Sequence, residues 1–464
     1  MTMTKTMTKK SFRKKLLAVG LLAASMASAP VLAKVSPEEA AKLGKSLTIV
    51  GAEKAGNKDG SIPAYEGGLT QAPACYKGGS FLCNPFPDDK PLFTITKENY
   101  QQHKDKLTAG HVAMFERYDT FRMPVYTSKR TSALPDFVLD ETKKNASETE
   151  LVKGGDGLKN FNSWGYPFPI PQDGIEAIWN QIVRYRGTGA IRVTGQATPQ
   201  VNGSFNVVMF RDELQFRRAV KDLDPGEDEN VLFYFKQSVS SPARLAGNVL
   251  LVHETIDQVK EPRKAWIYNA GQRRVRRAPQ VAYDGPGTAS DGLRTADNFD
   301  LYNGAPDRYT WKLVGKKEVY IPYNSYKLDE KGVKYDDIIK PGHLNPDLTR
   351  YELHRVWVIE AKLKDGTRHV YGARTFYLDE DSWQAGVIDL FDGRGNLWRV
   401  QEAHHIQYYN ATVPWYAMET VYDLQNGRYL ALGLENEEEE GILFGVETSK
   451  VDWKPQALRR EGRR

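Results

Sequence analysis

The chain has 464 residues, of which 40% are hydrophobic and 27% are charged, a composition typical of a globular protein with a sizeable core. Lysine and arginine number 64 against 59 aspartate and glutamate residues, but six of the basic residues precede residue 16, which leaves 58 basic against 59 acidic residues. A balance so close to neutrality gives no reason to expect nucleic-acid binding, which draws on a positively charged surface.

The first 33 residues have the pattern of a secretory signal peptide. Six lysine and arginine residues precede an apolar run from Leu16, which ends at Val31-Leu32-Ala33 in a small-residue cleavage pattern. The run is shorter than the roughly 20 residues that a membrane span needs, and no cysteine follows Ala33 to accept a lipid. We therefore predict export to the periplasm with a mature terminus at Lys34, with association at the outer membrane as an open alternative.

Helical and irregular segments are predicted for the N-terminal third of the exported chain. Ser36-Pro37-Glu38-Glu39 has the pattern of a capping box that opens a short helix. Residues 51–91 are rich in glycine and proline, which indicates a long strap lying over a surface. Residues 96–118 predict two short helices that are broken near Gly110.

The two cysteines, Cys75 and Cys83, bracket a loop that contains Gly78 and Gly79. The glycine pair lets the loop turn back on itself, and export places it in an oxidising compartment. Because no C-x-x-C motif is present, a structural disulfide is favoured over a catalytic thiol. We predict a Cys75–Cys83 disulfide, and loop entropy gives about 2 to 3 kcal/mol for so short a ring.

Residues 165–187, GYPFPIPQDGIEAIWNQIVRYRG, are the most informative stretch of the chain. The prolines hold the backbone near polyproline II, Asp173 can cap the helix that follows, and Arg184 and Arg186 mark its end. One interpretation is an ordinary helix packed on a core, and the other is a lid over a hydrophobic cavity. The apolar stripe, at helical spacing, consists of Ile175, Ile178, Trp179, Ile182 and Val183.

From residue 186 onward the pattern changes to strands joined by short connections. Residues 364–366, 392–396 and 425–427 are typical of hairpin turns, so consecutive strands are expected to pair antiparallel in one large, strongly curved sheet. The predicted strands cover residues 190–194, 205–210, 231–239, 248–256, 264–268, 311–322, 352–363, 368–378, 385–391, 397–408, 417–424 and 429–434.

Several of these strands are apolar on both faces. In residues 355–359, RVWVI, both alternating sets of side chains are apolar, and residues 249–252 and 374–378 also lack a clean polar face. Both sides of the sheet must therefore be covered. Since few helices are predicted between residues 187 and 434, we expect much of the second face to line a cavity, which the 9 tryptophans and 24 tyrosines would suit.

We predict that a helix over residues 173–185 closes this cavity. The prediction rests on the apolar stripe and on aromatic residues in strands with two apolar faces. Trp179 and Ile182 would face the ligand. The predicted lid and lining residues are Trp164, Phe168, Ile178, Trp179, Ile182, Trp266, Tyr268, Trp357, Ile359, Phe376 and Leu378.

Polar and charged segments lie between the strands. The arginines within residues 273–277 are interpreted as a solvated basic surface. Residues 290–294 and 303–308 are dense polar loops, which turns at structural positions would explain. The alternative is a mouth that receives a partner or a polar headgroup, built by Asp291, Arg294, Asp307 and Arg308.

The sequence contains no nucleophile elbow, zinc-protease motif, P-loop or dinucleotide fingerprint. His404 and His405 are neighbours on a predicted strand and would point to opposite faces, so we interpret both as structural. Asp379, Glu380 and Asp381 form a turn, where a solvated loop is favoured over a calcium site because the remaining loop ligands are missing. We predict no catalytic residues, no metal and no cofactor.

Three long segments carry a resemblance to a known family. They are the motif at residues 165–187, the stretch RRVRRAPQVAYDGPGTASDGLRTADNFDLYNGAPDRYTWKLVGKKEVYIPYNSY, and YELHRVWVIEAKL followed by RTFYLDEDSW. With them the chain resembles the bacterial family catalogued as domain of unknown function 1329, over nearly the whole exported chain. The family is described as similar to outer-membrane lipoprotein-sorting proteins.

The resemblance implies an α+β fold in which a large curved antiparallel β-sheet forms a half-barrel, as in the periplasmic lipoprotein carriers of the Lol system. Helices would close its hydrophobic cavity. The expected organisation is a signal peptide over residues 1–33, an irregular helical N-terminal extension with the disulfide over 34–160, and the half-barrel over 161–464. The family brings no catalytic residues to carry over. Its members tend to be encoded beside an exporter of the resistance-nodulation-division type and an outer-membrane protein, which are the implied partners.

The leading hypothesis is a non-catalytic periplasmic carrier or adaptor that binds a lipid or another hydrophobic molecule between the inner and outer membranes. One alternative is a periplasmic hydrolase acting on a lipid ester. The other is a scaffold that links the exporter to the outer-membrane protein and carries nothing.

Overall fold

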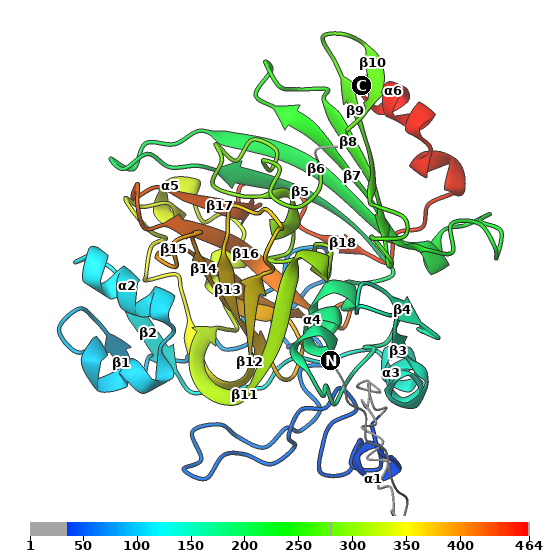
Figure 1. The fold of residues 1–464 in the computed structure, drawn as a ribbon. Helices are drawn as coiled ribbons and strands as arrows, with labels where there is room; N and C mark the ends of the chain where they lie inside the picture. Colours follow the sequence, from blue (N-terminus) through cyan, green and yellow to red (C-terminus); the bar gives the residue numbers. More distant parts are fainter. Residues whose placement is uncertain (1–34, 279–280, 463–464) are drawn as a thin grey trace, which may run out of the picture. The chain divides into compact units, whose positions relative to one another are not determined.

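One large open sheet organises the computed structural model, which describes residues 35–278 and 281–462 (Figure 1). The protein is a mixed α+β structure, and the predicted large antiparallel sheet is confirmed. The signal peptide and its cleavage site lie outside the described residues. None of the helices in the described part of the chain combines the length and the apolar character that a membrane crossing demands.

Two antiparallel meanders form the sheet, and they join where β17 pairs with β5. The first consists of β5 (Gly189–Ala197), β6 (Val207–Phe216), β7 (Val231–Ser241), β8 (Val249–Thr255), β9 (Lys264–Asn269) and β10 (Arg274–Arg277). The second consists of β11 (Tyr309–Pro322), β12 (Tyr351–Leu363), β13 (Ala373–Asp379), β14 (Ala385–Phe391), β15 (Leu397–Tyr408), β16 (Val413–Asp423) and β17 (Tyr429–Leu434).

Short strands complete the edges. β1 (Phe93–Ile95) pairs with β2 (Met123–Tyr126), which lies parallel to β12. β18 (Leu443–Phe444) pairs with β5, and a separate small sheet joins β3 (Glu150–Leu151) to β4 (Leu158–Lys159). Apart from the β2–β12 pair, the pairings between these described strands are antiparallel.

The helices are short and lie mostly outside the strand region. The α-helices are α1 (Pro37–Ala40), α2 (Ala109–Arg117), α3 (Asp136–Glu148), α4 (Gly174–Val183), α5 (Tyr335–Ile338) and α6 (Leu458–Glu461). The 3-10 turns are η1 (Tyr100–Lys106), η2 (Arg217–Ala219), η3 (Ala296–Asn298), η4 (Pro306–Arg308), η5 (Tyr326–Asp329), η6 (Lys450–Trp453) and η7 (Pro455–Ala457).

The break between the two helices predicted in residues 96–118 differs from the expectation. It lies at Leu107-Thr108, because the Thr108 hydroxyl accepts from the His111 amide at 3.0 Å and caps α2. Gly110 lies inside α2 instead. A side chain there would collide with Asp389 and Val400, so glycine permits close packing of this helix on the sheet.

Hydrophobic cores lie on both faces of the second meander, as its two-sided apolar pattern predicts. Ile359 of β12 packs in one core, and its neighbour Val358 packs in the other. Helix α4 lies against β11 and β12 on the first side (Figure 1), and α2 lies against β14 and β15 on the second. The described residues, 35–278 and 281–462, belong to one compact unit.

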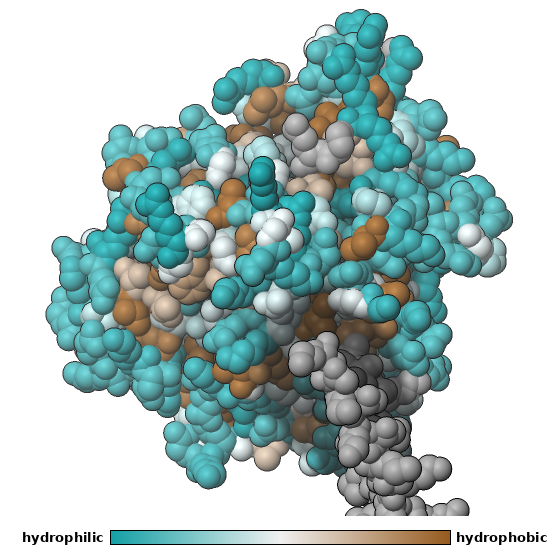
Figure 2. All heavy atoms as spheres, viewed as in Figure 1, coloured by the Kyte–Doolittle hydropathy of each residue, from teal (hydrophilic) through white to brown (hydrophobic). Residues whose placement is uncertain are grey.

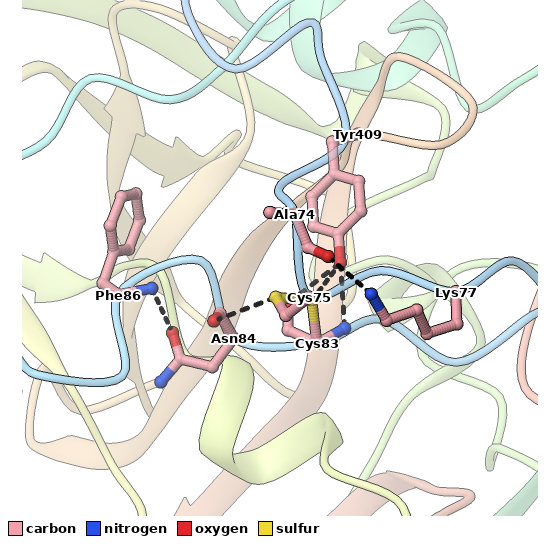
Figure 3. The surroundings of a disulfide bond; sticks show 7 residues. All are labelled: Ala74, Cys75, Lys77, Cys83, Asn84, Phe86 and Tyr409. Carbon is pink, nitrogen blue, oxygen red and sulfur yellow. Dashed lines mark hydrogen bonds between the residues drawn. A yellow bond between two sulfur atoms is a disulfide. The ribbon is translucent and has the colours of Figure 1, made fainter.

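The predicted disulfide between Cys75 and Cys83 is confirmed. Figure 3 shows the hydroxyl of Tyr409, which follows β15, at the bridge. This hydroxyl accepts from the Cys83 amide at 2.8 Å and donates to the Cys83 carbonyl at 2.9 Å. The bridge therefore closes a loop of the glycine-rich strap that is also tied to the sheet.

Helix α4 forms where the sequence predicts it, with the Asp173 carboxylate accepting from the Glu176 amide at 2.9 Å. It ends at Val183, two residues early, because Arg184 adopts an extended backbone. The Asn180 side chain bonds both the amide and the carbonyl of Phe168, which fixes the proline-rich segment against the helix.

Glu176 in the first turn of α4 makes a pH-dependent contribution to stability. Its side chain is buried, and burial, aided by the negative charge of Asp173, raises its pKa to about 7 although the Gln172 amide donates to it. A carboxyl whose folded pKa is raised favours folding below its unfolded pKa of about 4.5 and loses that contribution as the pH rises to about 7.

We expect Glu176→Gln to gain about 2 kcal/mol relative to the wild type between about pH 5 and about pH 8, since the amide avoids the buried charge. Urea unfolding at both pH values measures the difference. The exposed Glu38, changed to glutamine in the same way, controls for pH effects elsewhere in the chain. An advantage of Glu176→Gln that is equal at both pH values would contradict the prediction.

Candidate ligand cavity

The outer part of the first meander, β7 to β9, has two apolar faces with different neighbours. On one face Tyr234, Leu251 and Tyr268 pack with Trp453 and Leu458 of the C-terminal segment. Figure 1 shows α6 of that segment beside β9 and β10. Because side chains alternate along a strand, the residues between these point to the other face.

That other face lines a cavity with a volume of about 530 Å³, within the range of about 300 to 1,000 Å³ that small-molecule sites occupy. The face of the molecule seen in Figure 2 is different, since it is mostly hydrophilic with hydrophobic residues in small groups. The apolar residues that β7, β8 and β9 contribute to the cavity wall are Phe233, Phe235, Leu250, Val252 and Ile267.

Residues 281–303, here termed the covering loop, supply the opposite wall, with Val281 and Phe299 among its lining residues. Residues at the C-terminal end of α4 and just after it bind this loop. The Asp300 carboxylate forms ion pairs with both Arg184 and Arg186, and all three side chains are fully buried. The Gln181 amide also donates to the Asp300 carbonyl at 2.9 Å.

The second meander anchors the covering loop at two further points. Arg374 of β13 donates to the Asp297 carboxylate at 2.5 Å. Burial alone would raise the pKa of Asp297, but the charge of Arg374 and a hydrogen bond with His369 hold it well below its usual range. Arg399 of β15 donates to the carbonyls of Gly292 and Leu293. These contacts hold the covering loop in place as one wall of the cavity.

Most of the buried charges in the cavity wall form ion pairs with one another. Arg192 of β5 pairs with Asp212 of β6 at 3.1 Å, and Arg263 pairs with Glu254 of β8 at 2.8 Å. Burial raises the pKa of Glu254 although Arg263 opposes the shift. Arg294 of the covering loop differs, because its guanidinium makes no hydrogen bond or ion pair with any residue that the structure describes.

The eleven predicted lid and lining residues lie elsewhere. Most of them pack in the core between α4 and the second meander, where Trp179 is 1% exposed. Trp266 and Tyr268 pack on the C-terminal side of β9. None of the eleven lines the cavity described above, and contact between them and a ligand stays a prediction. The residues concerned are Trp164, Phe168, Ile178, Trp179, Ile182, Trp266, Tyr268, Trp357, Ile359, Phe376 and Leu378.

Of the four residues proposed as a mouth, Arg294 lines the cavity. Asp291 accepts from Arg428 at 2.8 Å. Asp307 accepts from the Tyr283 hydroxyl at 3.1 Å, and Arg308 lies over the Tyr283 ring at 3.3 Å from its centre. The structure thus brings Asp307 and Arg308 together at Tyr283 of the covering loop, and these three residues do not line the cavity. A role for the four in receiving a partner or headgroup stays a prediction.

Several polar wall residues were missed from the sequence, although a signal was present. Gln237 follows Phe233 and Phe235 at a spacing of two, and Glu254 follows Leu250 and Val252 in the same way. Because side chains alternate along a strand, Gln237 and Glu254 are expected on the same face as these apolar residues.

The turn at residues 379–381 is buried, which corrects its interpretation as a solvated loop. Arg130 donates two hydrogen bonds to Asp381, at 2.8 and 2.6 Å, and Arg355 of β12 donates to Glu380 at 2.7 Å. Burial, followed by the charge of Asp381, raises the pKa of Asp379 to about 7. Arginines that are distant in sequence neutralise the turn, so its local pattern did not reveal its burial.

One group in the described part of the chain has metal-ligand spacing: His354, Asp379 and Asp381, whose ligand atoms lie within 4.8 Å of one another. Because Arg130 occupies both oxygens of Asp381, we interpret the group as part of the ion-pair network. The pair His404 and His405 diverges as expected. His404 faces Tyr351, and His405 stacks on Tyr323 at 4.2 Å between ring centres.

The fold and the site together define a mixed α+β protein with a partly apolar cavity between an antiparallel sheet and a fixed loop. Residues 94–459 match the family model described as protein of unknown function (DUF1329), and the chain belongs to this family. The uncharacterized protein PA3922 of Pseudomonas aeruginosa is 62% identical over 448 residues, which cover 96% of this chain and 98% of that protein.

Two solved structures show similarity at low sequence identity. A putative outer membrane lipoprotein-sorting protein domain from Vibrio parahaemolyticus is 14% identical, with a TM-score of 0.42, over 62% of this chain and 98% of that one. A DUF1329 family protein from Desulfovibrio piger is 13% identical, with a TM-score of 0.42, over 59% of this chain and 92% of that one.

Proposed function

We propose that this protein is a non-catalytic periplasmic carrier that binds a lipid or another hydrophobic molecule in the cavity between β7–β9 and the covering loop. The observation that carries the proposal is the apolar inner face of these strands. The other face of the same strands is covered by packed side chains, whereas the inner face leaves a volume of about 530 Å³. Phe299 of the covering loop contacts the rings of Phe233 and Phe235, but the apolar surface that faces the remaining volume gains packing contacts only when a ligand fills it.

The proposal includes a half-barrel, in which the first meander wraps the ligand and the covering loop closes the open side. It also includes export through cleavage after Ala33, an N-terminal extension over residues 34–160 and a carrier region over 161–464. N-terminal sequencing of the protein recovered from the periplasm should begin at Lys34. An exporter of the resistance-nodulation-division type and an outer-membrane protein are the proposed partners in traffic between the membranes.

Filling the cavity tests the proposal. We expect Leu250→Trp to weaken the binding of an uncharged apolar fluorescent dye at least about tenfold, since the larger ring occupies the volume that the ligand needs. Organic extracts of gently purified wild-type protein should contain a hydrophobic molecule by mass spectrometry, and extracts of Leu250→Trp should contain much less.

The matched control is Val314→Trp, which adds the same ring at a residue of β11 that is 40% exposed and does not line the cavity. This variant should bind the dye and retain the extracted molecule like the wild type. Unchanged dye binding by a folded Leu250→Trp protein would refute this cavity as the carrier site.

A further inference from the structure

Arg294 is the buried charged group of the cavity wall whose guanidinium the described residues leave without a hydrogen bond or ion pair. Its residue is 9% exposed, although charged side chains are rarely buried to this extent unless they are paired. The other two buried arginines of the wall, Arg192 and Arg263, both have carboxylate partners.

The backbone of the covering loop fixes the position of Arg294. Its carbonyl accepts from the Gly287 amide at 2.9 Å and from the Ser290 hydroxyl at 3.4 Å. The side chain passes so close to Gly287 that a Cβ atom there would lie 2.9 Å from the Arg294 Nε. A glycine at residue 287 therefore leaves the space in which the guanidinium lies.

Neighbouring acidic groups do not neutralise Arg294 fully. The carboxylates that face it are Asp212 and Glu419, and Arg192 faces it with the same charge as its own. Asp212 already pairs with Arg192 and accepts from Gln237. Burial, with the charge of Asp300, raises the pKa of Glu419, which weakens this carboxyl as a countercharge for Arg294. In agreement, burial lowers the pKa of Arg294 despite these acids.

The cavity wall as a whole has an excess of positive charge. Arg276 and Arg277 of β10 are exposed residues at its edge, where they would attract anions toward the opening. The apolar surface of Phe233, Phe235 and Leu250 belongs to the same cavity as Arg294. The site therefore offers an apolar wall for a tail and an unpaired guanidinium for a charged end.

We propose that the cavity selects amphiphiles with an anionic headgroup, a phosphate or a carboxylate, which Arg294 binds while the tail lies along β7 and β8. A guanidinium presents a planar fork of donors that matches the two oxygens of either group. This inference rests on the proposed carrier function and adds the class of its ligand.

Competition against the uncharged dye tests the inference with ligands of one chain length: dodecanoate, dodecyl phosphate and dodecanol. The wild type should bind both anions at least about tenfold more tightly than the alcohol, as expected for charge-assisted hydrogen bonds. The tighter of the two anions identifies the headgroup. Inorganic phosphate alone should leave the dye bound, and displacement by it would show a free-anion site and overturn the inference.

Arg294→Gln should lose the preference by weakening the binding of the anions about tenfold, with little change for dodecanol. Arg294→Lys, which keeps the charge, should retain part of the preference. The control Arg276→Gln removes one charge from the exposed edge and should keep most of it. Thermal unfolding should show no destabilisation of Arg294→Gln, because no described partner is left unpaired, whereas a structural arginine would show a clear loss.

The failures of the two proposals are distinguishable. If the wild type binds dodecanol as tightly as dodecanoate and dodecyl phosphate, the anionic headgroup is refuted and the carrier function stands. If Arg294→Gln keeps the full preference, the assignment of the headgroup to Arg294 is refuted, and the carrier function again stands. If none of the three ligands displaces the dye, the carrier function itself fails in this cavity.

Discussion

Replacing Asp300 with asparagine is expected to lower the free energy of unfolding by about 3 to 5 kcal/mol, the range for breaking a buried ion pair by removing one partner. Asp300 neutralises both Arg184 and Arg186, and all three side chains are fully buried. The substitution leaves two buried guanidinium groups without a countercharge. Asparagine is the suitable change because Asp300 has a left-handed backbone, with φ of 52°, which asparagine also adopts readily.

Urea unfolding measures this loss, and binding of the apolar dye measures its effect on the cavity. Because Asp300 anchors the covering loop, dye affinity should fall together with stability. The control is Asp347→Asn, which removes an aspartate that is 67% exposed beside Arg122 and should change stability little. An Asp300→Asn protein as stable as the wild type would show that the arginines find other partners and that the anchor is dispensable.

Trp179→Ala is expected to cost about 3 to 5 kcal/mol, the usual price of deleting a buried aromatic side chain. Trp179 is 1% exposed in the core beneath α4. Its indole nitrogen also donates to the Gly155 carbonyl at 2.8 Å, so the substitution leaves that carbonyl unpaired as well. Trp179→Phe keeps most of the ring and should cost considerably less.

The dye affinity of Trp179→Ala separates the two interpretations of this helix. Since Trp179 lines no part of the cavity described here, the variant should bind the dye like the wild type while its unfolding midpoint falls. The exposed Val201, changed to alanine, should alter neither quantity. A small loss of stability with changed dye affinity would instead place the ligand beneath α4, as the lid interpretation has it.

The position of α4 could be predicted from the sequence, whereas its role could not. An apolar stripe and a capping aspartate are local signals, and they locate the helix to within two residues at its C-terminal end. The same stripe suits a lid and a core helix equally, because periodicity does not identify what covers the apolar face. Arg184 and Arg186 are typical of a helix end. Their ion-pair partner, Asp300, lies more than a hundred residues away in the sequence, so the local pattern does not predict the pairing.

For the strands too, the sequence predicts most positions but not every role. Alternation and hairpin turns located most of the two meanders, but β10, with the sequence RVRR, was interpreted as a solvated basic cluster because it lacks an apolar face. It pairs with β9 and contributes two arginines to the cavity. Among the predicted site residues, Arg294 lies in the cavity wall, and the dense polar loop that contains it is a recognisable signal. The apolar residues of that wall have no such signal, because their alternation in the sequence resembles that of any strand packed on a core.

The anchors of the covering loop bear on the order in which the protein becomes functional. Most of its cavity wall comes from the first meander, and Arg184 and Arg186, which bind Asp300, precede that meander. Arg374 and Arg399, which also hold the loop, belong to strands that are made later. A chain that folds from its N-terminal end therefore forms most of the wall before the last two of these anchors. If the protein is the carrier proposed above, its ligand has no complete cavity to enter until the last strands are in place, and a bound ligand would then stabilise the contact between the two meanders.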